Sequence, residues 1–312
     1  MKKNIFSFLL LITCISCNTD TSKVENTTTG GYTKVISDIS FQPIIDTEEY
    51  TFESLYKYAK VDVKYKPEAD VINDFMNDSV QTMIISRQLT TEEEKYLQDS
   101  KSYYPRTTKI AYDALAFIVN KENPDSLIRY DILKKIFTGE FSTWKQIHET
   151  SKLGQLKIVF DNLKSANTRF IREKFAVKDS FPNYCFAVNT NQEVIKYVEK
   201  NINAIGIISV SWVSDRDDPQ TMNFLKIIKV LHITSEIDPQ GIDYYGPYQA
   251  YIATLDYPFR REVYMICKET FAGLGSGFTQ FIAGETGQRI ILKSGIMPAN
   301  MPIRLIQTKN SF

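Results

Sequence analysis

The sequence predicts an α/β fold in two doubly wound lobes. Its 312 residues exceed the size at which one hydrophobic core usually keeps growing, so two units of about 100 to 200 residues each are expected. From residue 33 onward, short β runs alternate with amphipathic helical segments. This succession predicts βαβ units, in which mostly parallel strands form a sheet with helices on both faces.

The first part of the folded chain contains three strand–helix pairs. Three apolar runs predict the strands: 33–39, 61–65 and 79–86. Pro67 predicts the start of the second helix, because proline is favoured in the first helical turn. Thr90 and Glu93 have the spacing of a capping box and predict the start of the third helix.

Residues 106–120, RTTKIAYDALAFIVN, form a near-continuous apolar run. Such a run predicts a strand buried on both faces, the kind found in parallel sheets. Pro124 then breaks the chain, and a helix at 129–137 is expected to end at Gly139. Later segments predict further elements of a second lobe: strands at 156–160 and 203–210, and helices at 166–176 and 191–199.

The N-terminus, MKKNIFSFLLLITCISC, predicts an export signal. Two lysines precede an apolar run of roughly ten residues, too short for a membrane span of about 20 residues. The Ser16-Cys17 ending resembles a lipoprotein signal, so residues 1–17 are expected to be a signal peptide that ends at an acylated Cys17. The alternatives are cleavage at Thr13-Cys14 or an ordinary signal peptide cut nearby. Residues 18–31 are polar and predict a flexible tether.

The charge balance limits the partners. Lysine plus arginine equals aspartate plus glutamate, with 37 residues of each kind. No polybasic patch argues for nucleic acid. A small anion would therefore be held by local donors rather than by a broad positive field.

Several motifs follow one another in order along the chain: AYDALAFIVN and NPDS, Ile-Phe-Thr-Gly at 136–139, Trp144, SANTRF at 165–170, NQEVIKYVEKNINAIGIISVSW at 191–212, YPFRREVYMI at 257–266, and a GxGFxxFIxGExGQxIILKxGxMP ending. Their order and spacing resemble the phosphate-binding subunits of bacterial ABC importers. The resemblance covers nearly all of residues 34–303.

This resemblance implies the type 2 periplasmic binding protein fold, with two chain crossings that form a hinge. Lobe I is expected to comprise residues 32–116 and 238–312, and lobe II residues 117–237. An exported protein can form disulfides. However, the resemblance places Cys185 and Cys267 in different lobes, so we expect two buried free thiols.

In doubly wound sheets, ligands lie beyond the carboxyl ends of strands, where helix N-termini present free N–H groups. Ser40 follows the first strand, and its hydroxyl either caps the next helix or donates to an anion. Arg87 follows another buried strand and offers a fork of donors suited to a tetrahedral oxyanion. A solvated surface arginine is the alternative for Arg87.

A third junction is the loop DNLKSANT at 161–168. Ser165, Asn167 and Thr168 offer side-chain donors, and Ala166 offers its backbone N–H. In the family, this loop reads Arg, three residues, then Ser-Gly-Thr, and these residues hold the phosphate. Ser165 matches the serine, whereas Ala166 and Asn167 replace Gly and Thr. An ordinary helix cap by Ser165 or Asn167 is the structural alternative.

Three charged residues depart from the family pattern. Asp161 stands where the family has arginine, and Arg87 stands where many members have aspartate. We hypothesise that Arg87 clamps the oxyanion while Asp161 pairs with Arg87 or accepts a hydrogen bond from hydrogen phosphate. Sulfate has no such proton at neutral pH and would be rejected. Glu68 is poorly placed beside an anion, so either it points away or the ligand is not phosphate.

Other chemistry has little support in the sequence. GLGSG at 273–277 lacks the spacing of a dinucleotide fingerprint and the lysine of a phosphate loop. His148 and His232 have no partner at metal-ligand spacing. No GxSxG motif or nucleophile–base constellation supports the enzyme alternative, a phosphate-ester hydrolase. We therefore expect no enzyme activity, no cofactor and no metal.

The sequence predicts a monomeric lipoprotein of the cell envelope, anchored to a membrane and facing the periplasm or the exterior. It is expected to capture inorganic phosphate or a related oxyanion between its lobes and to deliver it to an ABC transporter permease. The alternative is that the same scaffold binds a different solute, or is a surface sensor or interaction module without transport. Glu68 and Asp161 favour this alternative.

Overall fold

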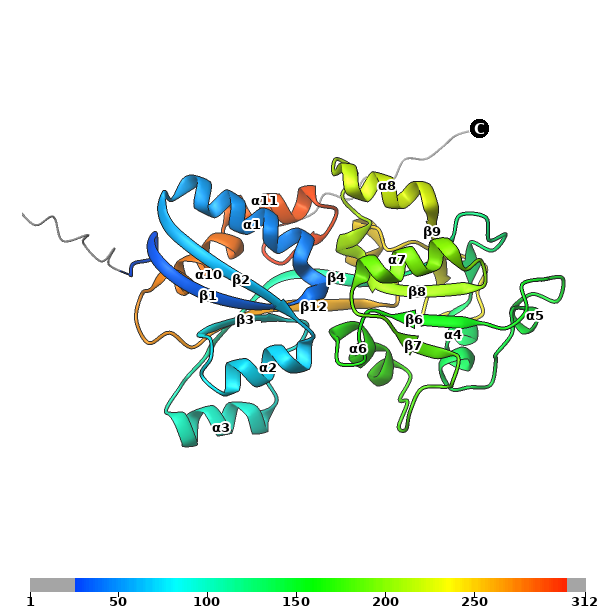
Figure 1. Cartoon of the computed structure of the whole chain (residues 1–312), viewed down its shortest axis with the longest axis horizontal. Helices are drawn as coiled ribbons and strands as arrows, with labels where there is room; N and C mark the ends of the chain where they lie inside the picture. Colours follow the sequence, from blue (N-terminus) through cyan, green and yellow to red (C-terminus); the bar gives the residue numbers. More distant parts are fainter. Residues whose placement is uncertain (1–25, 302–312) are drawn as a thin grey trace, which may run out of the picture.

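The computed structural model describes residues 26–301, so the predicted signal peptide, Cys17 and residues 18–25 lie outside the described residues. Figure 1 shows two lobes side by side. The first part of the chain forms one lobe together with the C-terminal helices α10 (Leu274–Ala283) and α11 (Glu285–Lys293), and the middle part forms the other. The predicted two-lobed α/β fold is confirmed.

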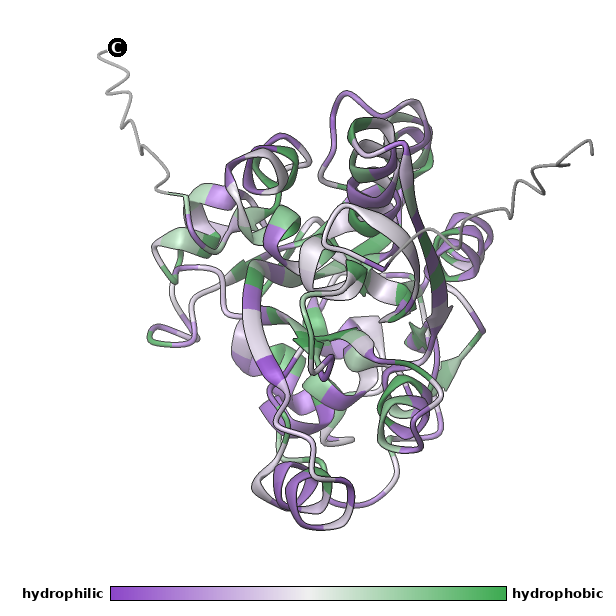
Figure 2. Ribbon diagram, turned by 90° about the vertical axis from the view of Figure 1, so that its left-hand side faces the viewer, coloured by the Kyte–Doolittle hydropathy of each residue, from purple (hydrophilic) through white to green (hydrophobic). Residues whose placement is uncertain are grey.

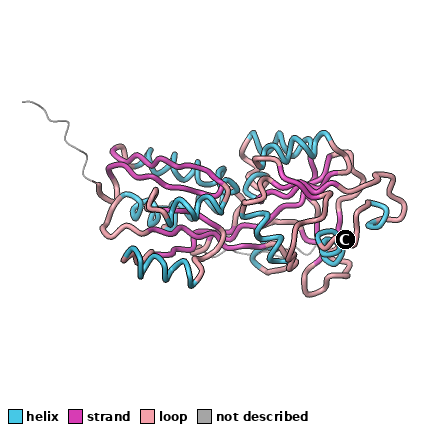
Figure 3. Tube along the Cα trace, turned by 60° about the horizontal axis from the view of Figure 1, so that its bottom comes forward, coloured by secondary structure: helices cyan, strands magenta, loops and turns pink. Residues whose placement is uncertain are grey.

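One sheet runs through both lobes, in the strand order β2-β1-β3-β12-β4-β8-β6-β7. The strand shared by the two lobes is β4 (Arg106–Asn120). Its residues 106–114 pair with β12 (Arg260–Cys267), and its residues 115–119 pair with β8 (Ala204–Ser209). Figure 3 shows these central strands running between the strand groups of the two lobes.

In the first lobe, β1 (Gly30–Asp38) lies between β2 (Tyr58–Lys66) and β3 (Thr82–Ile85), parallel to both. Helices cover both faces of this sheet (Figure 1). One face carries α10, α11 and α1 (Gln42–Leu55), and the other carries α2 (Glu68–Met76) and α3 (Thr91–Lys101). The predicted capping box of Thr90 and Glu93 is present at the start of α3.

The second lobe continues the sheet with β8, β6 (Lys157–Phe160) and β7 (Cys185–Ala187), while β9 (Ile228–Val230) pairs with β4. Its helices are α4 (Tyr130–Phe137), α5 (Trp144–Ile147), α6 (Ala166–Lys174), α7 (Asn191–Lys200) and α8 (Pro219–Ile227). Gly139, with φ of +87°, follows α4 as predicted. Figure 2 shows hydrophobic residues concentrated in the middle of the molecule and hydrophilic residues on the surrounding helices.

The strand directions differ from the sequence prediction at the centre of the sheet. Residues 114–119 of β4 are fully buried, as expected, but β4 is antiparallel to β12, β8 and β9. Burial on both faces of a strand depends on the layers packed above and below the sheet. It does not determine whether the neighbouring strands are parallel or antiparallel.

Two predicted boundaries need correction. Residues 26–31, assigned to the tether, belong to the folded part: β1 begins at Gly30, and Asn26 Oδ1 accepts a hydrogen bond of 3.0 Å from the N–H of Leu274. Residues 238–248 were assigned to lobe I. Instead, β11 (Tyr244–Tyr245) pairs with β10 (His232–Thr234), which pairs with β5 (Leu127–Ile128) of the second lobe.

The chain returns to the first lobe after this three-stranded sheet. Gln249 begins the short helix α9 (Gln249–Ala253) and donates through Nε2 to the carbonyls of Leu292 and Ile296. β13 (Met297–Pro298) then pairs with β4. Among residues 26–301, no helix has the length and apolar content needed to cross a bilayer.

The two cysteines of the described part lie on strands of different lobes. Cys185 is on β7 and Cys267 on β12, and both are free thiols. Cys267 is buried as expected, whereas Cys185 is only half-buried. Burial raises the pKa of Cys185 to about 12, so its reactive thiolate form is scarce at neutral pH.

Candidate functional site

The ends of three strands meet where the two lobes touch. β1 ends at Asp38, β3 ends just before Ser86, and β6 ends just before Asp161. All three residues are buried. The loops that follow these strands supply most of the residues predicted for ligand binding.

Ser40 is the first-lobe residue of this junction. It is fully buried in the short 3-10 turn η1 (Ile39–Phe41), and its hydroxyl donates to Asn167 Oδ1 of the second lobe at 3.3 Å. Its carbonyl accepts hydrogen bonds from Ser211 Oγ at 2.9 Å and Trp212 Nε1 at 3.1 Å. Ser40 therefore does not cap α1; it forms contacts between the lobes.

On the second-lobe side, the loop 161–168 has the conformation of a capped helix start. Ser165 Oγ accepts from the N–H of Thr168 at 3.2 Å and donates to Asp161 Oδ1 at 2.7 Å. Thr168 Oγ1 donates to the carbonyl of Asn162 at 2.6 Å. Ser165 thus caps α6, as the structural alternative predicted, and Thr168 holds the loop together. The N–H of Ala166 donates to Asp38 Oδ2 of the first lobe at 3.3 Å.

Two asparagines extend this network. Asn167 Nδ2 donates to Asn191 Oδ1 at 3.3 Å, and Asn191 Nδ2 lies 3.4 Å from Asp161 Oδ2. Both asparagines are fully buried. Burial, followed by the charge of Asp38, raises the pKa of Asp161 to about 7. Asp161 therefore holds its proton more readily than an ordinary aspartate does.

Arg87 lies in a different environment from the one predicted. Its Nη1 and Nη2 donate to the two carboxylate oxygens of Glu93, each at 2.7 Å, and Nη1 also donates to the carbonyl of Gln88. Glu93 is held at the start of α3 by the capping box, so it presents a fixed carboxylate to the neighbouring guanidinium. The predicted pairing of Arg87 with Asp161 is therefore wrong.

A different arginine reaches the junction. Arg169 of α6 forms an ion pair with Glu68 of α2, and its Nη2 donates to Ser86 Oγ at 2.7 Å. Glu68 is 2% exposed and also accepts from the N–H and Oγ of Ser86, both at 2.9 Å. Burial raises the pKa of Glu68, but these hydrogen bonds and the charge of Arg169 hold it below its usual value. Glu68 thus points into the contact between the lobes and is neutralised there.

A second buried ion pair lies beside the turn that contains Ser40. Arg261 of β12 and Asp113 of β4 are 3% and 1% exposed, and Arg261 Nε donates to Asp113 Oδ2 at 2.8 Å. Arg261 Nη2 lies 2.7 Å from the same oxygen but lacks hydrogen-bond geometry, and its Nη1 has no partner among residues 26–301. The guanidinium lies 5.0 Å from the centre of the Phe41 ring, beside the Ser40 turn. It therefore offers spare N–H donors in a buried place.

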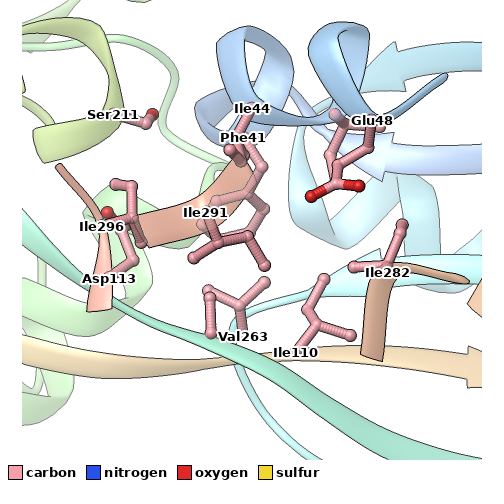
Figure 4. A pocket seen from close by; sticks show the side chains of 12 residues that line it. Phe41, Ile44, Glu48, Ile110, Asp113, Ser211, Val263, Ile282, Ile291 and Ile296 are labelled. Carbon is pink, nitrogen blue, oxygen red and sulfur yellow. The ribbon is translucent and has the colours of Figure 1, made fainter. Parts of the chain in front are cut away.

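A small cavity lined in part by Ile44, Ile45 and Glu48 of α1 is separate from the site described above. Figure 4 shows Glu48 among isoleucines and valine in this cavity, which has a volume of about 10 Å³. A cavity of this size holds one water at most, so it cannot bind a tetrahedral oxyanion. Both Glu48 carboxyl oxygens lack a hydrogen-bond partner in the described part of the chain, and burial raises the pKa of Glu48 to about 9.

The histidines do not contribute to the junction. His148 lies 3.4 Å from Asp125, and His232 is 3.3 Å from the Tyr248 hydroxyl. Within residues 26–301, no group of three or more histidine, cysteine, aspartate or glutamate side chains is arranged to hold a metal ion.

The junction also contains residues that the sequence interpretation missed. Asp38 lies at the end of a predicted strand, where polar side chains often contact ligands. That position could have identified Asp38 as a candidate site residue. Arg169 and Asn191 had no comparable signal, because both read as ordinary polar residues of amphipathic helices.

Comparisons with known proteins agree with this architecture. A family model described as the PBP superfamily domain matches residues 22–286. The phosphate-binding protein PstS of Borreliella burgdorferi is 26% identical over 314 residues, covering 95% of this chain and 99% of that protein. PstS of Bacillus subtilis is 23% identical over 283 residues, covering 90% and 85%.

A solved structure has the same fold. A phosphate ABC transporter substrate-binding protein from Clostridium perfringens, solved with bound phosphate, superimposes with a TM-score of 0.72 at 20% identity. The match covers 86% of this chain and 100% of that one. From the family match over most of its length and this two-lobed architecture, we conclude that the chain belongs to the PBP superfamily and has the type 2 periplasmic binding protein fold.

Proposed function

We propose that the chain is an extracytoplasmic solute-binding protein that captures inorganic phosphate, or a similar oxyanion, between its two lobes. The supporting observation is the convergence of buried donors from both lobes: Ser40 from the first, and Ala166 and Asn167 from the second. Arg261 adds a buried guanidinium with a spare N–H. Hydrogen-bond donors of this kind are the usual means of holding a small anion. The curated relatives are phosphate-binding proteins, which makes phosphate the first candidate.

Binding would couple to closure of the lobes. Donors from separate lobes satisfy one small ligand only when the lobes meet, so the ligand stabilises the closed arrangement. We propose that the closed protein delivers its ligand to an ABC transporter permease and has no catalytic role. The proposed lobe boundaries are residues 32–116 and 238–312 for one lobe and 117–237 for the other, adjusted for the strand at 244–245 described above.

Calorimetry tests the ligand assignment. The mature chain is unfolded, stripped of small molecules, refolded, and titrated with phosphate, arsenate, sulfate and molybdate. We expect one site that prefers phosphate. If none of the four anions binds, the anion assignment is wrong although the fold stands.

Asp161→Asn tests how the protein rejects sulfate. At pH 8, above the pKa of about 7, the Asp161 carboxylate accepts a hydrogen bond from the protonated oxygen of hydrogen phosphate but faces only acceptors on sulfate. Asparagine supplies a donor, so we expect the preference for phosphate to fall by about one to two orders of magnitude, the effect of about 1.5–3 kcal/mol in a hydrogen bond to a charged group. Asp70→Asn, at the exposed rim, is the control. An unchanged phosphate-to-sulfate ratio of dissociation constants would rule out this role.

Cys17 is the proposed membrane attachment point. We expect mass spectrometry of the mature N-terminus to find a lipid-modified Cys17, and Cys17→Ser to release the protein from the membrane fraction. An unmodified Cys17 at or near the mature N-terminus would contradict the lipid anchor.

A second candidate function is the capture of a different, less anionic solute, or a sensor role without transport. The observation that favours it is the pair of buried carboxyl groups, Asp38 and Asp161, neither of which has an ion-pair partner among residues 26–301. A thermal-shift screen with neutral and cationic solutes discriminates between the two, because a true ligand raises the melting temperature by an amount that grows with the logarithm of its concentration divided by its dissociation constant.

A further inference from the structure

The Asp38 carboxylate connects the two lobes through backbone N–H groups. Asp38 is fully buried at the end of β1. Its Oδ1 accepts from the N–H of Ser40 at 2.8 Å, in its own lobe. Its Oδ2 accepts from the N–H of Ala166 at 3.3 Å, in the other lobe. The Asp38 carboxylate therefore accepts hydrogen bonds from the backbones of Ser40 and Ala166. The proposed function assigns both of these residues to the ligand site.

The partner at Ala166 is the first amide of the helix α6, which runs to Lys174. This amide has no acceptor within its own helix, and the helix dipole makes its surroundings favourable for a negative charge. A carboxylate has the same kind of acceptor oxygens as a solute oxyanion. Asp38 therefore takes the place at this amide that a solute anion would need.

The charged groups around Asp38 do not provide a cation of its own. The two nearby arginines form ion pairs with other acids, Arg169 with Glu68 and Arg261 with Asp113, although the charge of Arg261 still opposes the rise in the pKa of Asp38. Asp161, the remaining acid, contacts Ser165 and Asn191. Burial and the charge of Glu68 raise the pKa of Asp38, which shows how costly an additional negative charge is at this position. A bound oxyanion and an ionised Asp38 therefore repel each other.

We propose that Asp38 is an internal anion that latches the lobes together and that a solute anion must displace from the Ala166 amide. This inference rests on the proposed function for the identity of the competing ligand. The latch itself concerns only the contact between the lobes. It makes Asp38 a residue that sets which anions are bound and how tightly.

Asp38→Asn breaks the latch with a minimal change. The one oxygen of asparagine can keep the hydrogen bond to the Ser40 amide, but its NH₂ group then faces the N–H of Ala166, donor against donor. We expect the ligand-free variant to have a larger radius of gyration than wild type by small-angle X-ray scattering. We also expect phosphate to bind the variant on the order of 10 to 100 times more tightly at pH 8, because its charge-assisted competitor is gone.

Ala166→Pro removes the other half of the latch. Proline lacks an N–H but is well tolerated in the first turn of a helix, and Ser165 before it already has an extended backbone with φ of −75° and ψ of 161°. We expect this variant to be as open as Asp38→Asn without ligand. It should not gain affinity for phosphate, because the amide is lost to both anions. If Asp38→Asn fails to fold, the radius of gyration of ligand-free Ala166→Pro alone tests whether the latch exists.

Asp70→Asn is the matched control, since Asp70 forms an exposed ion pair with Lys164 across the same contact between the lobes. Its radius and affinity should match wild type. Equal radii for ligand-free wild type, Asp38→Asn and Ala166→Pro would overturn the latch, as would weaker phosphate binding by Asp38→Asn. If the variants open but no protein binds phosphate, the latch is supported and the phosphate assignment fails.

Discussion

Arg261→Met is expected to lower the free energy of unfolding by about 3–5 kcal/mol and to abolish anion binding. The stability loss follows because Asp113, which is 1% exposed and whose pKa burial already raises, would lose the cation that stabilises its charge. The loss of binding follows because Arg261 Nη1 is a buried N–H without a partner in the described part of the chain, beside the Ser40 turn. Urea unfolding followed by circular dichroism measures the first effect, and calorimetry with phosphate measures the second.

A double variant separates these two roles. Replacing both partners of a buried ion pair by apolar residues is often neutral or stabilising, whereas removing one partner is costly. Arg261→Met with Asp113→Leu should therefore recover most of the lost stability but not the binding of phosphate. Arg289→Met, which removes an exposed cation paired with Glu285, should change stability by less than about 0.5 kcal/mol. Recovery of binding in the double variant would exclude Arg261 as a ligand donor.

Local patterns in the sequence were sufficient to predict most elements of the fold. The capping box at Thr90, the strand 33–39 and the loop 161–168 depend on residues close together in the chain, and the structure places these elements as predicted. The convergence of Ser40 with the second-lobe loop was also predicted and is present, because strand ends in doubly wound sheets lie at one edge.

The errors concern partners that are distant in sequence or choices among side-chain conformations. Arg87 follows its strand as predicted, but its guanidinium pairs with the carboxylate of Glu93, six residues later, in its own lobe. Arg169 reads as a solvent-facing residue of an amphipathic helix, yet it pairs with Glu68, which is about a hundred positions away. No periodicity in one segment can predict a contact of that kind, because it depends on how the two lobes meet.

Glu48 is a different case, since its burial could have been predicted. Ile44, Ile45, Glu48 and Phe52 recur at helical spacing, and all four are buried on one side of α1. A carboxyl group on this buried face of the helix either forms an ion pair or keeps its proton. Figure 4 shows Glu48 facing the apolar cavity, and its raised pKa is a consequence.

Glu48 therefore makes the stability of the protein depend on pH. Burial raises the pKa of Glu48 in the folded state to about 9, from its ordinary value of 4.5. Between these two values, the unfolded chain has lost the proton and the folded chain keeps it, so the free energy of unfolding falls as pH rises. The slope is about 1.4 kcal/mol per pH unit. Asp161 adds a loss of stability of the same sign, between its ordinary pKa of 3.8 and its folded-state pKa of about 7.

Glu48→Gln removes this titration and keeps the shape of the side chain. We expect its stability relative to wild type to rise by about 4 kcal/mol between pH 5 and pH 8, three pH units at the slope above. Urea unfolding at both pH values, with the exposed Glu94→Gln as control, measures the difference. A relative stability that is the same at both pH values would mean that Glu48 is ionised in the folded protein, in which case α1 and the Ser40 turn that precedes it must move to admit water.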